Sequence, residues 1–357
     1  MKEGKKLKHK KIFILAYARC NLGDDLFIYM LLKKYPNNQF YIHIKDPEHA
    51  KLFEQFSNIT IIPEKERALT KENAKEYDQY IYVGGSIFME GGVVYNISEQ
   101  FLDFIKECKK NNIPFNYISS NFGPAYTKQY VELAKKVYQN CTDICFRDKN
   151  SYNSFKEILT VRYAPDLAFC CPIRDEIKKP STVGISVIDL LIRKPLKEKE
   201  LIYYKMLVNN IVDYINLGKE IYLFSFCKYE GDERAIQKLL KMLPTEYKKH
   251  VHTVYYHGNL EEFLTIYQSM EYIICSRFHA MILSVIMGQR CRILSYSNKI
   301  DYVIEDLQLF KQKILRFEEL EENLKIPLEQ FESVPKEKVN AIIEQAKEQL
   351  KSLEKVI

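Results

Sequence analysis

The chain has 357 residues, of which 46% are hydrophobic and 28% charged, and these proportions are typical of a globular protein with room for two domains. No apolar run reaches the ~18 residues of a membrane-spanning helix. Most of the net charge of +6 lies in the first eleven residues, which hold six Lys and one Glu, so the rest of the chain is nearly neutral. A nucleic-acid binder would spread Lys and Arg over a face, so we expect no nucleic-acid partner.

The basic segment 1–10 has two interpretations. It can be a solvated tail, which is the simpler interpretation, or it can rest on anionic lipid, where each basic residue near the surface contributes about 1 kcal/mol. The apolar run 12–18 ends at Arg19 and has no small-residue cleavage site, so we interpret it as a first strand and not as a signal peptide. We therefore expect a cytoplasmic protein, with contact at the inner face of the membrane if the tail binds lipid.

The nine cysteines are scattered along the chain. Their odd number and mostly apolar surroundings are typical of reduced thiols in a cytosol. Cys141 and Cys145, followed by Cys170 and Cys171, are candidates for a metal site. Their spacing is not that of a zinc ribbon, so we predict no metal.

The first half of the chain alternates short apolar runs with helical patterns. The predicted strands are 12–16, 40–44, 59–62, 80–83, 115–118 and 143–146, and the predicted helices include 24–35, 98–110 and 128–138. Short, largely apolar strands that alternate with helices indicate a parallel sheet covered on both faces.

The segment 172–181 is polar and contains Pro172 and Pro180, and we predict a linker there. The alternation then restarts, with strands at 183–187, 221–224, 252–255, 272–275 and 292–294 and helices at about 199–217, 232–243, 260–269 and 279–287. Apolar residues at spacings of three and four predict a last amphipathic helix. We predict an N-terminal α/β domain, a C-terminal α/β domain and a C-terminal helix, at 11–172, 181–330 and 335–357. Two such Rossmann-like domains would bind ligands at strand C-terminal ends, in a cleft between them.

Polar residues gather in the loop after the first predicted strand. Gly23 permits a tight turn, and Asp24 or Asp25 can cap the helix that follows. Capping explains only one Asp, and it does not explain Arg19 or Asn21. We therefore expect this loop to offer hydrogen bonds to hydroxyl groups.

Other strand ends of the first half also carry polar or glycine residues. Gly84 and Gly85 would let backbone approach a ligand closely, although glycine turns are common at strand ends. Asn121 follows the strand at 115–118. Arg147 stands where a strand becomes a helix, so it could bind an anion beside the helix N-terminus. The alternative is an ion pair with Asp148 or a neighbouring carboxylate.

The second half has a cation and a titratable ring in Ser276-Arg277-Phe278-His279, directly after a buried strand. Burial alone would favour apolar residues there. Lys299 follows the next predicted strand. Three cations, Arg147, Arg277 and Lys299, together with His279, suit a small, multiply charged anion. The alternative is a packed histidine beside a structural ion pair.

The order of these elements resembles the polysaccharide pyruvyltransferase family over residues 11 to 305. The shared elements are Asn21-Leu22-Gly23-Asp24, Gly84-Gly85, Gly123-Pro124, Arg147-Asp148-x-x-Ser151, Pro165-Asp166, Gly184-Ile185-Ser186, Ser276-Arg277-x-His279 and Tyr296-x-x-Lys299. The last two are the most specific. The chain departs from the family at Ser86, where a third Gly is frequent, and at Phe278, where Leu is frequent. Neither departure removes a charged group.

The resemblance implies a two-domain fold like that of the GT-B glycosyltransferases. It also implies transfer of pyruvate from phosphoenolpyruvate to two hydroxyls of a hexose, with formation of a cyclic ketal and release of phosphate. The acceptor would belong to a surface polymer or to its lipid-linked oligosaccharide precursor. The reaction needs no cofactor and no metal.

The roles of the residues follow from the same resemblance. His279 would move protons, because its side chain titrates near neutral pH. Phosphoenolpyruvate would be bound by Arg147, Arg277, Lys299 and Ser276. Asp24 would act on the acceptor hydroxyls as a catalytic group, and the acceptor would be bound by Asn21, Gly84, Gly85, Glu90 and Asn121.

Two other functions fit the same residues. The chain could be a nucleotide-sugar glycosyltransferase in polysaccharide synthesis, with Arg277 and Lys299 on a diphosphate. It could also be an inactive relative that acts as a binding partner in a polymer-synthesis complex. Release of phosphate from phosphoenolpyruvate without a nucleotide would favour the pyruvyltransferase.

Overall fold

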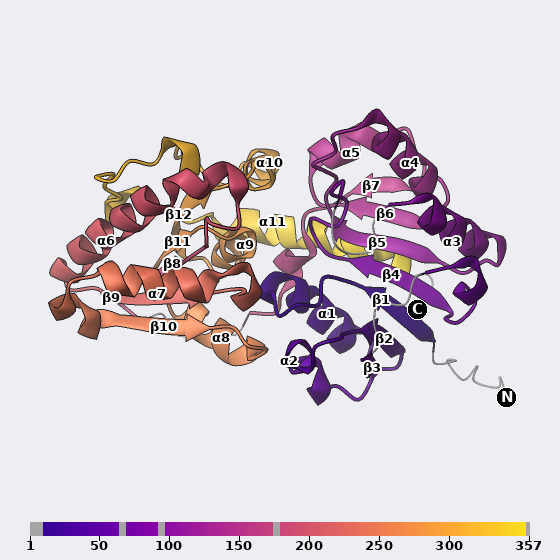
Figure 1. The fold of residues 1–357 in the computed structure, drawn as a ribbon, viewed down its shortest axis with the longest axis horizontal. Helices are drawn as coiled ribbons and strands as arrows, with labels where there is room; N and C mark the ends of the chain where they lie inside the picture. Colours follow the sequence, from indigo (N-terminus) through magenta and orange to yellow (C-terminus); the bar gives the residue numbers. More distant parts are fainter. Residues whose placement is uncertain (1–9, 64–68, 92–96, 174–178, 355–357) are drawn as a thin grey trace. The chain divides into compact units, whose positions relative to one another are not determined.

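The computed structural model describes residues 10–63, 69–91, 97–173 and 179–354 (Figure 1). The chain divides into two compact units. Unit 1 consists of Met1–Ala18, Phe27–Leu167 and Ala346–Ile357, and unit 2 consists of Arg19–Leu26 and Ala168–Gln345. The predicted basic tail, except for Lys10, and the central part of the predicted linker lie outside the described residues.

Unit 1 contains a seven-stranded sheet in the order β3-β2-β1-β4-β5-β6-β7, in which every pairing is parallel. Its strands are β1 (Lys11–Leu15), β2 (Gln39–His43), β3 (Ile59–Ile62), β4 (Gln79–Val83), β5 (Phe115–Ser120), β6 (Asp143–Phe146) and β7 (Val161–Tyr163). The helices of this part of the chain are α1 (Leu22–Lys34), α2 (Pro47–Ala50), α3 (Glu99–Lys110), α4 (Lys128–Tyr138) and α5 (Lys149–Phe155). The first six strands were predicted. β7 was not, because it has only three residues.

One face of this sheet is covered by α3 and α4 (Figure 1). The helix α3 is amphipathic, and Ser98 caps it by accepting a hydrogen bond of 3.1 Å from the Phe101 N–H. Its buried side chains pack on aromatic residues of the strands. Tyr80, for example, meets Phe104 edge-to-face at 5.0 Å between ring centroids. This core fixes the strands whose C-terminal ends carry the candidate residues of unit 1.

Unit 2 contains a six-stranded parallel sheet in the order β10-β9-β8-β11-β12-β13. Its strands are β8 (Thr182–Ser186), β9 (Glu220–Ser225), β10 (Val251–Tyr255), β11 (Tyr272–Cys275), β12 (Arg290–Ser295) and β13 (Leu315–Arg316). Its helices are α6 (Glu200–Asn216), α7 (Asp232–Met242), α8 (Leu260–Gln268), α9 (Phe278–Ile286), α10 (Asn298–Leu307) and α11 (Lys336–Ala346). Of these, α10 and the two-residue β13 were not predicted. The strand order reverses between β8 and β11, and ligands of open α/β sheets bind at such a reversal.

The boundaries of the two units differ from the contiguous domains predicted from the linker. The segment Arg19–Leu26, which includes the start of α1, belongs to unit 2, where the Leu22 N–H donates to the Phe226 carbonyl at 3.0 Å and Asn21 forms a β-bridge with Cys227. At the other end, the predicted helix 335–357 divides into α11, a 3₁₀ turn at Lys347–Leu350 and α12 (Lys351–Glu354). The part from Ala346 onward belongs to unit 1.

Gln349 attaches that last segment to unit 1 and is fully buried. Its side-chain amide donates to the carbonyls of Ala164 (2.7 Å) and Pro165 (3.1 Å) and accepts from the Ser119 N–H at 2.8 Å. Ala164 and Pro165 are the two residues before Asp166, so Gln349 near the C-terminus fixes one of the strand-end loops of unit 1.

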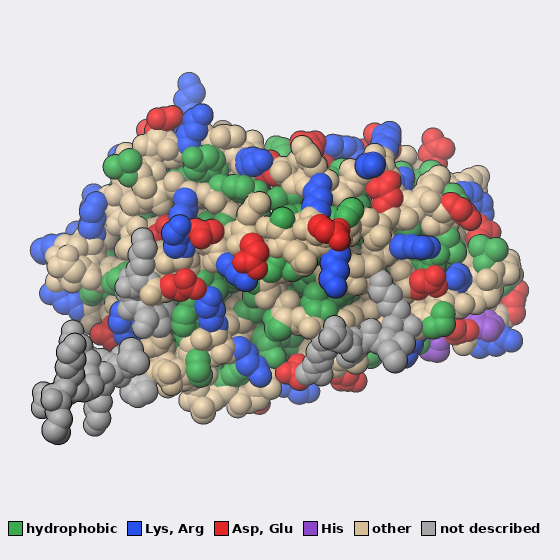
Figure 2. Space-filling model, turned by 180° about the vertical axis from the view of Figure 1, so that it is seen from behind, with side chains coloured by type: hydrophobic (Ala, Val, Ile, Leu, Met, Phe, Trp, Pro, Cys, Tyr) green, Lys and Arg blue, Asp and Glu red, His purple; other side chains and the backbone are tan. Residues whose placement is uncertain are grey.

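Within the described residues, none of the helices has the length and apolar character needed to cross a bilayer. All nine cysteines are thiols, with no disulfide between them. On the face shown in Figure 2, the described Lys and Arg side chains are interspersed with Asp and Glu.

Candidate functional site

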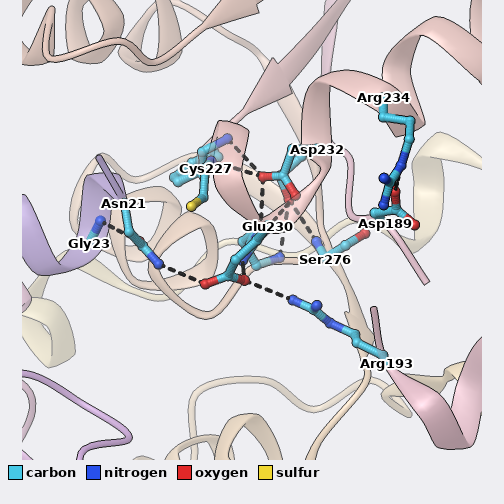
Figure 3. A network of polar contacts seen from close by, with 12 residues as sticks. Asn21, Gly23, Asp189, Arg193, Cys227, Glu230, Asp232, Arg234 and Ser276 are labelled. Carbon is cyan, nitrogen blue, oxygen red and sulfur yellow. Dashed lines mark hydrogen bonds and ion pairs between the residues drawn. The ribbon is translucent and has the colours of Figure 1, made fainter. Parts of the chain in front are cut away.

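A buried network of ion pairs lies at the C-terminal ends of β8, β9 and β11 in unit 2 (Figure 3). Its centre is Arg277, the residue before α9, which is only 6% exposed. The Arg277 Nε donates to Asp232 at 3.1 Å, and its two terminal nitrogens contact Asp232 and Glu230. The structural ion pair, which the sequence left as the alternative, is therefore present, and it involves two carboxylates.

Asp232 is the fixed partner of Arg277. It is the first residue of α7 and is fully buried, and its Oδ2 also accepts the backbone N–H groups of Phe226 and Cys227 at 3.0 Å each. Burial raises the pKa of Asp232 to about 6, although Arg277 opposes the rise. The carboxyl is therefore mainly ionised at neutral pH.

Glu230 accepts hydrogen bonds from three side chains. Its Oε1 accepts from the Asn21 amide at 3.1 Å, and its Oε2 accepts from Arg193 at 3.2 Å and from Arg277. Burial raises the pKa of Glu230, but Arg277 and Arg193 outweigh this effect and bring it down to about 2. Glu230 is therefore a carboxylate at neutral pH, and its side chain is 25% exposed.

His279 is the second residue of α9 and is half-buried. Its ring lies directly against Gly23, because a Cβ atom built on Gly23 would be 1.7 Å from the imidazole Nδ1. Gly23 is therefore required because the imidazole approaches it closely. The sequence had suggested a different reason, namely a tight turn. The Gly23 N–H donates to the Asn21 Oδ1 at 3.1 Å, so one amide side chain contacts both Gly23 and Glu230.

The two aspartates after Gly23 have different surroundings. Asp24 is half-buried in the first turn of α1. Asp25 is fully buried and accepts a hydrogen bond of 2.8 Å from the Tyr256 hydroxyl. Burial raises the pKa of Asp25 well above its usual value. Of the two, Asp24 is the candidate for acting on a substrate.

Lys299 and Arg193 both contact the ring of Tyr296. The Lys299 Nζ lies 5.4 Å from the ring centroid and the Arg193 guanidinium carbon 4.5 Å from it, distances typical of cation–π contacts. Burial raises the pKa of Tyr296, but Lys299, Arg193 and Arg277 together lower it below its usual value. The edge of unit 2 that carries His279 is thus rich in positive charge.

Ser276 does not present its hydroxyl to this edge. It is fully buried, its N–H donates to the Ser186 Oγ at 2.7 Å, and its hydroxyl lies 3.4 Å from that of Tyr203. Its contacts join the ends of β8 and β11. The predicted role of Ser276 in substrate binding is not supported by these contacts.

Unit 1 has its own buried arginine, Arg147, which is 3% exposed. Its terminal nitrogens donate to the Asp166 carboxylate at 2.9 Å and to the Asn121 Oδ1 at 2.7 Å. The sequence suggested Asp148 or a neighbouring carboxylate as the ion-pair partner, and Asp166 is such a neighbour. The Asp148 carboxylate accepts the N–H of Ser151 at 2.7 Å and caps α5. The ion pair shown for Arg147 is with Asp166.

Of the two predicted glycines of unit 1, Gly85 borders Arg147 and Gly84 shapes the chain next to Gly85. A Cβ atom on Gly85 would lie 2.4 Å from both terminal nitrogens of Arg147, so Gly85 gives space to the guanidinium. Gly84 has a φ of 142°, a conformation that other residues rarely adopt. Asn121 connects the two loops, because its N–H donates to the Gly85 carbonyl at 2.8 Å.

Glu90 is used differently from the expectation. Its carboxylate accepts the N–H of Thr127 at 2.8 Å, the hydroxyl of Thr127 at 2.5 Å and the N–H of Tyr126. Thr127 caps α4, so Glu90 supports the start of that helix. Glu90 also borders an open pocket lined by Glu99, Tyr130 and Lys136.

The structure therefore gathers the predicted residues into two sets. Unit 1 brings Gly85, Asn121 and Arg147 together around Asp166, and unit 2 brings together Asn21, Gly23, Arg277, His279 and Lys299. Sequence reasoning missed Arg193, Glu230 and Asp232. The polar run that follows β9 at the C-terminal edge of a parallel sheet is the pattern that could have identified the two carboxylates.

In the described parts of the chain, no group of three or more His, Cys, Asp or Glu side chains is arranged to hold a metal ion. The donors described above are mostly cationic, so they suit an anionic ligand and not a metal.

Comparison with known proteins agrees with the two-sheet architecture. The model of the family described as polysaccharide pyruvyl transferase matches residues 21–298. Comparison with curated proteins gives no match. Several solved structures with TM-scores above 0.5 are similar to the chain.

The S. aureus MnaA structure with UDP has a TM-score of 0.55 at 10% identity and covers 87% of this chain and 85% of its own. The UDP-GlcNAc 2-epimerase of Methanocaldococcus jannaschii has a TM-score of 0.52 at 12% identity, with coverages of 94% and 91%. The putative UDP-N-acetylglucosamine 2-epimerase of Listeria monocytogenes has a TM-score of 0.52 at 10% identity, with coverages of 96% and 87%. These likenesses show the GT-B-like α/β fold, with parallel sheets of seven and six strands.

Proposed function

Because the chain belongs to the polysaccharide pyruvyl transferase family, we propose that it transfers pyruvate from phosphoenolpyruvate to two hydroxyls of a hexose, forming a cyclic ketal and releasing phosphate. The hexose belongs to a surface polysaccharide or to its lipid-linked oligosaccharide precursor. The observation that supports the proposal best is the position of His279, which lies against Gly23 at the start of α9 beside the cations of unit 2.

The chemistry of the reaction explains why a histidine is needed. Ketal formation begins with a proton added to the methylene carbon of phosphoenolpyruvate, which gives C2 oxocarbenium character. One sugar hydroxyl attacks C2, phosphate leaves, and the second hydroxyl closes the ring. Of the two hydroxyl protons, one balances the proton delivered to the methylene carbon and the other leaves with phosphate. Such proton transfers at neutral pH suit an imidazole, and we assign them to His279.

The cations bind the donor in this proposal. Arg277 and Lys299 in unit 2 contribute positive charge toward the carboxylate and phosphate of phosphoenolpyruvate. The family resemblance assigns Arg147 to the same donor, and Asp166 and Asn121 fix the direction of its guanidinium. The acceptor is bound by the loops that hold Asn21 and Asp24 and by the strand-end glycines of unit 1, with Asp24 acting on a hydroxyl.

The place of action follows from the substrates. Phosphoenolpyruvate is a cytoplasmic metabolite, so we propose that the protein acts in the cytoplasm, and nine thiols without a disulfide support this location. The basic N-terminal segment would bring the protein to the inner face of the membrane, where a lipid-linked acceptor is found.

The test is a reaction of purified protein with phosphoenolpyruvate and a hexose-containing acceptor. We expect phosphate release without a nucleotide, together with an acceptor whose mass increases by that of a pyruvate ketal. Transfer from a nucleotide sugar, with binding of a nucleoside diphosphate, would instead identify a glycosyltransferase. Turnover of neither donor would identify an inactive relative.

A further inference from the structure

Three side-chain donors from distant parts of the chain meet on one carboxylate. Asn21 precedes α1, Arg193 lies in the loop after β8, and Arg277 precedes α9, and all three donate to Glu230 (Figure 3). Such a set of one amide and two guanidinium groups is the usual protein site for a carboxylate or a phosphate. In this structure an acidic residue of the protein itself occupies it.

The two carboxylates on Arg277 are held very differently. Asp232 is fully buried and accepts two backbone N–H groups, so its removal from the network would leave a buried charge without solvent. Glu230 is 25% exposed and its carboxylate is held by side chains. It can regain water when it leaves, so Glu230 is the carboxylate that another anion can replace.

The charges around Glu230 agree with this distinction. With Glu230 in place, three cations (Arg193, Arg277 and Lys299) face two carboxylates. Without it, the same three cations face Asp232 alone, so the local charge changes from one positive to two positive. The ring of Tyr296, which contacts both Arg193 and Lys299, provides a flat apolar surface beside the same cations.

We propose that the Glu230 carboxylate stands in for an oxyanion of the substrate, and that Arg277 and Arg193 bind that oxyanion when Glu230 turns away, while the Asn21 amide is released to the acceptor hydroxyls. This inference rests on the proposed function, because it identifies the oxyanion as the carboxylate or the phosphate of phosphoenolpyruvate. Arg193 then becomes a substrate-binding residue. Asp232 remains on Arg277 and fixes the direction of its guanidinium.

The direction in which one substitution changes KM for phosphoenolpyruvate tests the proposal. If Glu230 competes with the substrate, Glu230→Gln lowers KM for phosphoenolpyruvate by about 10-fold, because the competing charge is gone. If Glu230 only holds the network together, the same change raises KM. Glu220→Gln is the matched control, because Glu220 begins strand β9, at the opposite end from the turn that carries Glu230, and contacts His250 and His252. Its KM stays at the wild-type value.

Two simple anions distinguish the two parts of the substrate. Inorganic phosphate and pyruvate are titrated into wild-type protein and Glu230→Gln by calorimetry. A tighter phosphate complex in the variant assigns the site to the phosphate, and a tighter pyruvate complex assigns it to the carboxylate. Unchanged binding of both anions, in a variant with wild-type melting, overturns the proposal.

Arg193 provides a test that does not depend on the folding of the Glu230 variant. Arg193→Ala raises KM for phosphoenolpyruvate by about 10-fold or more, and Arg193→Lys restores part of the loss. Equal KM values in wild-type protein and Arg193→Ala overturn the assignment. Failure of the proposed function is distinguishable, because wild-type protein would then release no phosphate from phosphoenolpyruvate while the titrations with inorganic phosphate still report on the site.

Discussion

Arg147 in unit 1 and Arg277 in unit 2 occupy equivalent positions, yet their surroundings differ. Each follows a parallel strand, precedes a helix and pairs with a fully buried aspartate, Asp166 or Asp232. The next partner of Arg147 is the neutral amide of Asn121, whereas that of Arg277 is the carboxylate of Glu230. The strand-end position explains why each arginine is buried and anchored. In our proposal, the second partner determines which of the two arginines can exchange an anion.

The glycines extend this comparison. Gly85 gives space to the guanidinium of Arg147, and Gly23 gives space to the imidazole of His279. In unit 1 the group beside the glycine is the anchored guanidinium of Arg147. In unit 2 it is the imidazole of His279, which can move protons. We therefore expect the chemical step to depend on unit 2 more than on unit 1.

The largest expected effect tests that difference directly. His279→Ala should lower kcat by about 10²–10⁴-fold and change KM for phosphoenolpyruvate little, because general acid–base catalysis acts on the chemical step. The control is His257→Ala, which removes another histidine of unit 2 that contacts Glu233. A folded His279→Ala enzyme with a kcat near that of wild-type protein would remove the imidazole from the mechanism.

The next effect compares the two buried aspartates. Asp166→Asn should destabilise the protein by about 3–5 kcal/mol, because it removes the buried carboxylate that pairs with the Arg147 guanidinium. Asp232→Asn should cost about 1–3 kcal/mol, because Glu230 still neutralises Arg277. Both losses of unfolding free energy are to be measured by chemical denaturation. The surface change Asp103→Asn, which loses an exposed contact with Lys71, should cost less than about 1 kcal/mol.

The two aspartate variants can contradict the comparison in a simple way. Equal losses would mean that Glu230 does not compensate for Asp232. The buried environments of the two arginines would then be energetically equivalent, and their different second partners would have no consequence for stability.

A third test uses the two glycines. Gly23→Ala should displace the imidazole and lower kcat by about 10–100-fold, since a small misplacement of a catalytic group is costly. Gly85→Ala should displace the Arg147 guanidinium and mainly lower the melting temperature. Gly218→Ala serves as the control, because nothing lies within 4 Å of its Cβ and only its φ of +76° opposes the change. A Gly23→Ala enzyme with normal kcat would show that the contact with His279 is not needed.

Most strands were predictable because they are short apolar runs, and Ile59–Ile62 and Tyr272–Cys275 match the observed strands residue for residue. The short β7 and β13 leave too few residues for any pattern. The division into units was not predictable from a linker, because it depends on long-range contacts. Gln349, for example, returns the end of the chain to Ala164 and Pro165.

The site was predictable in its strand-end residues and not in its partners. The positions of Arg147, Arg277 and His279 after strands indicated a polar edge, and the structure places them there. The identity of each counter-ion required the tertiary structure, because Asp232 and Glu230 follow a different strand from Arg277. The close contact between Gly23 and His279 joins residues more than 250 positions apart, and no local pattern reports such a contact.

The last expected effect concerns acid stability, and it depends on the second carboxylate partner of Arg277, Glu230. The pKa of Glu230 is lowered from its usual 4.5 to about 2, so the unfolded chain binds the proton more tightly. The stabilisation by this ionised group is therefore complete above pH 4.5 and is lost as the pH falls toward 2. At about 1.4 kcal/mol per pKa unit, the loss is at most about 3.5 kcal/mol.

Asp232 acts in the opposite direction, because its pKa is raised to about 6 and its ionisation reduces stability as the pH rises from about 4 to 6. Glu230→Gln therefore isolates one of the two effects. Between pH 4.5 and the lowest pH at which the protein still folds, the melting temperature of wild-type protein should fall more steeply than that of Glu230→Gln. Parallel curves would show that the ion pairs of Glu230 contribute no net stability, and its carboxylate would then leave Arg277 at little cost when an anion binds.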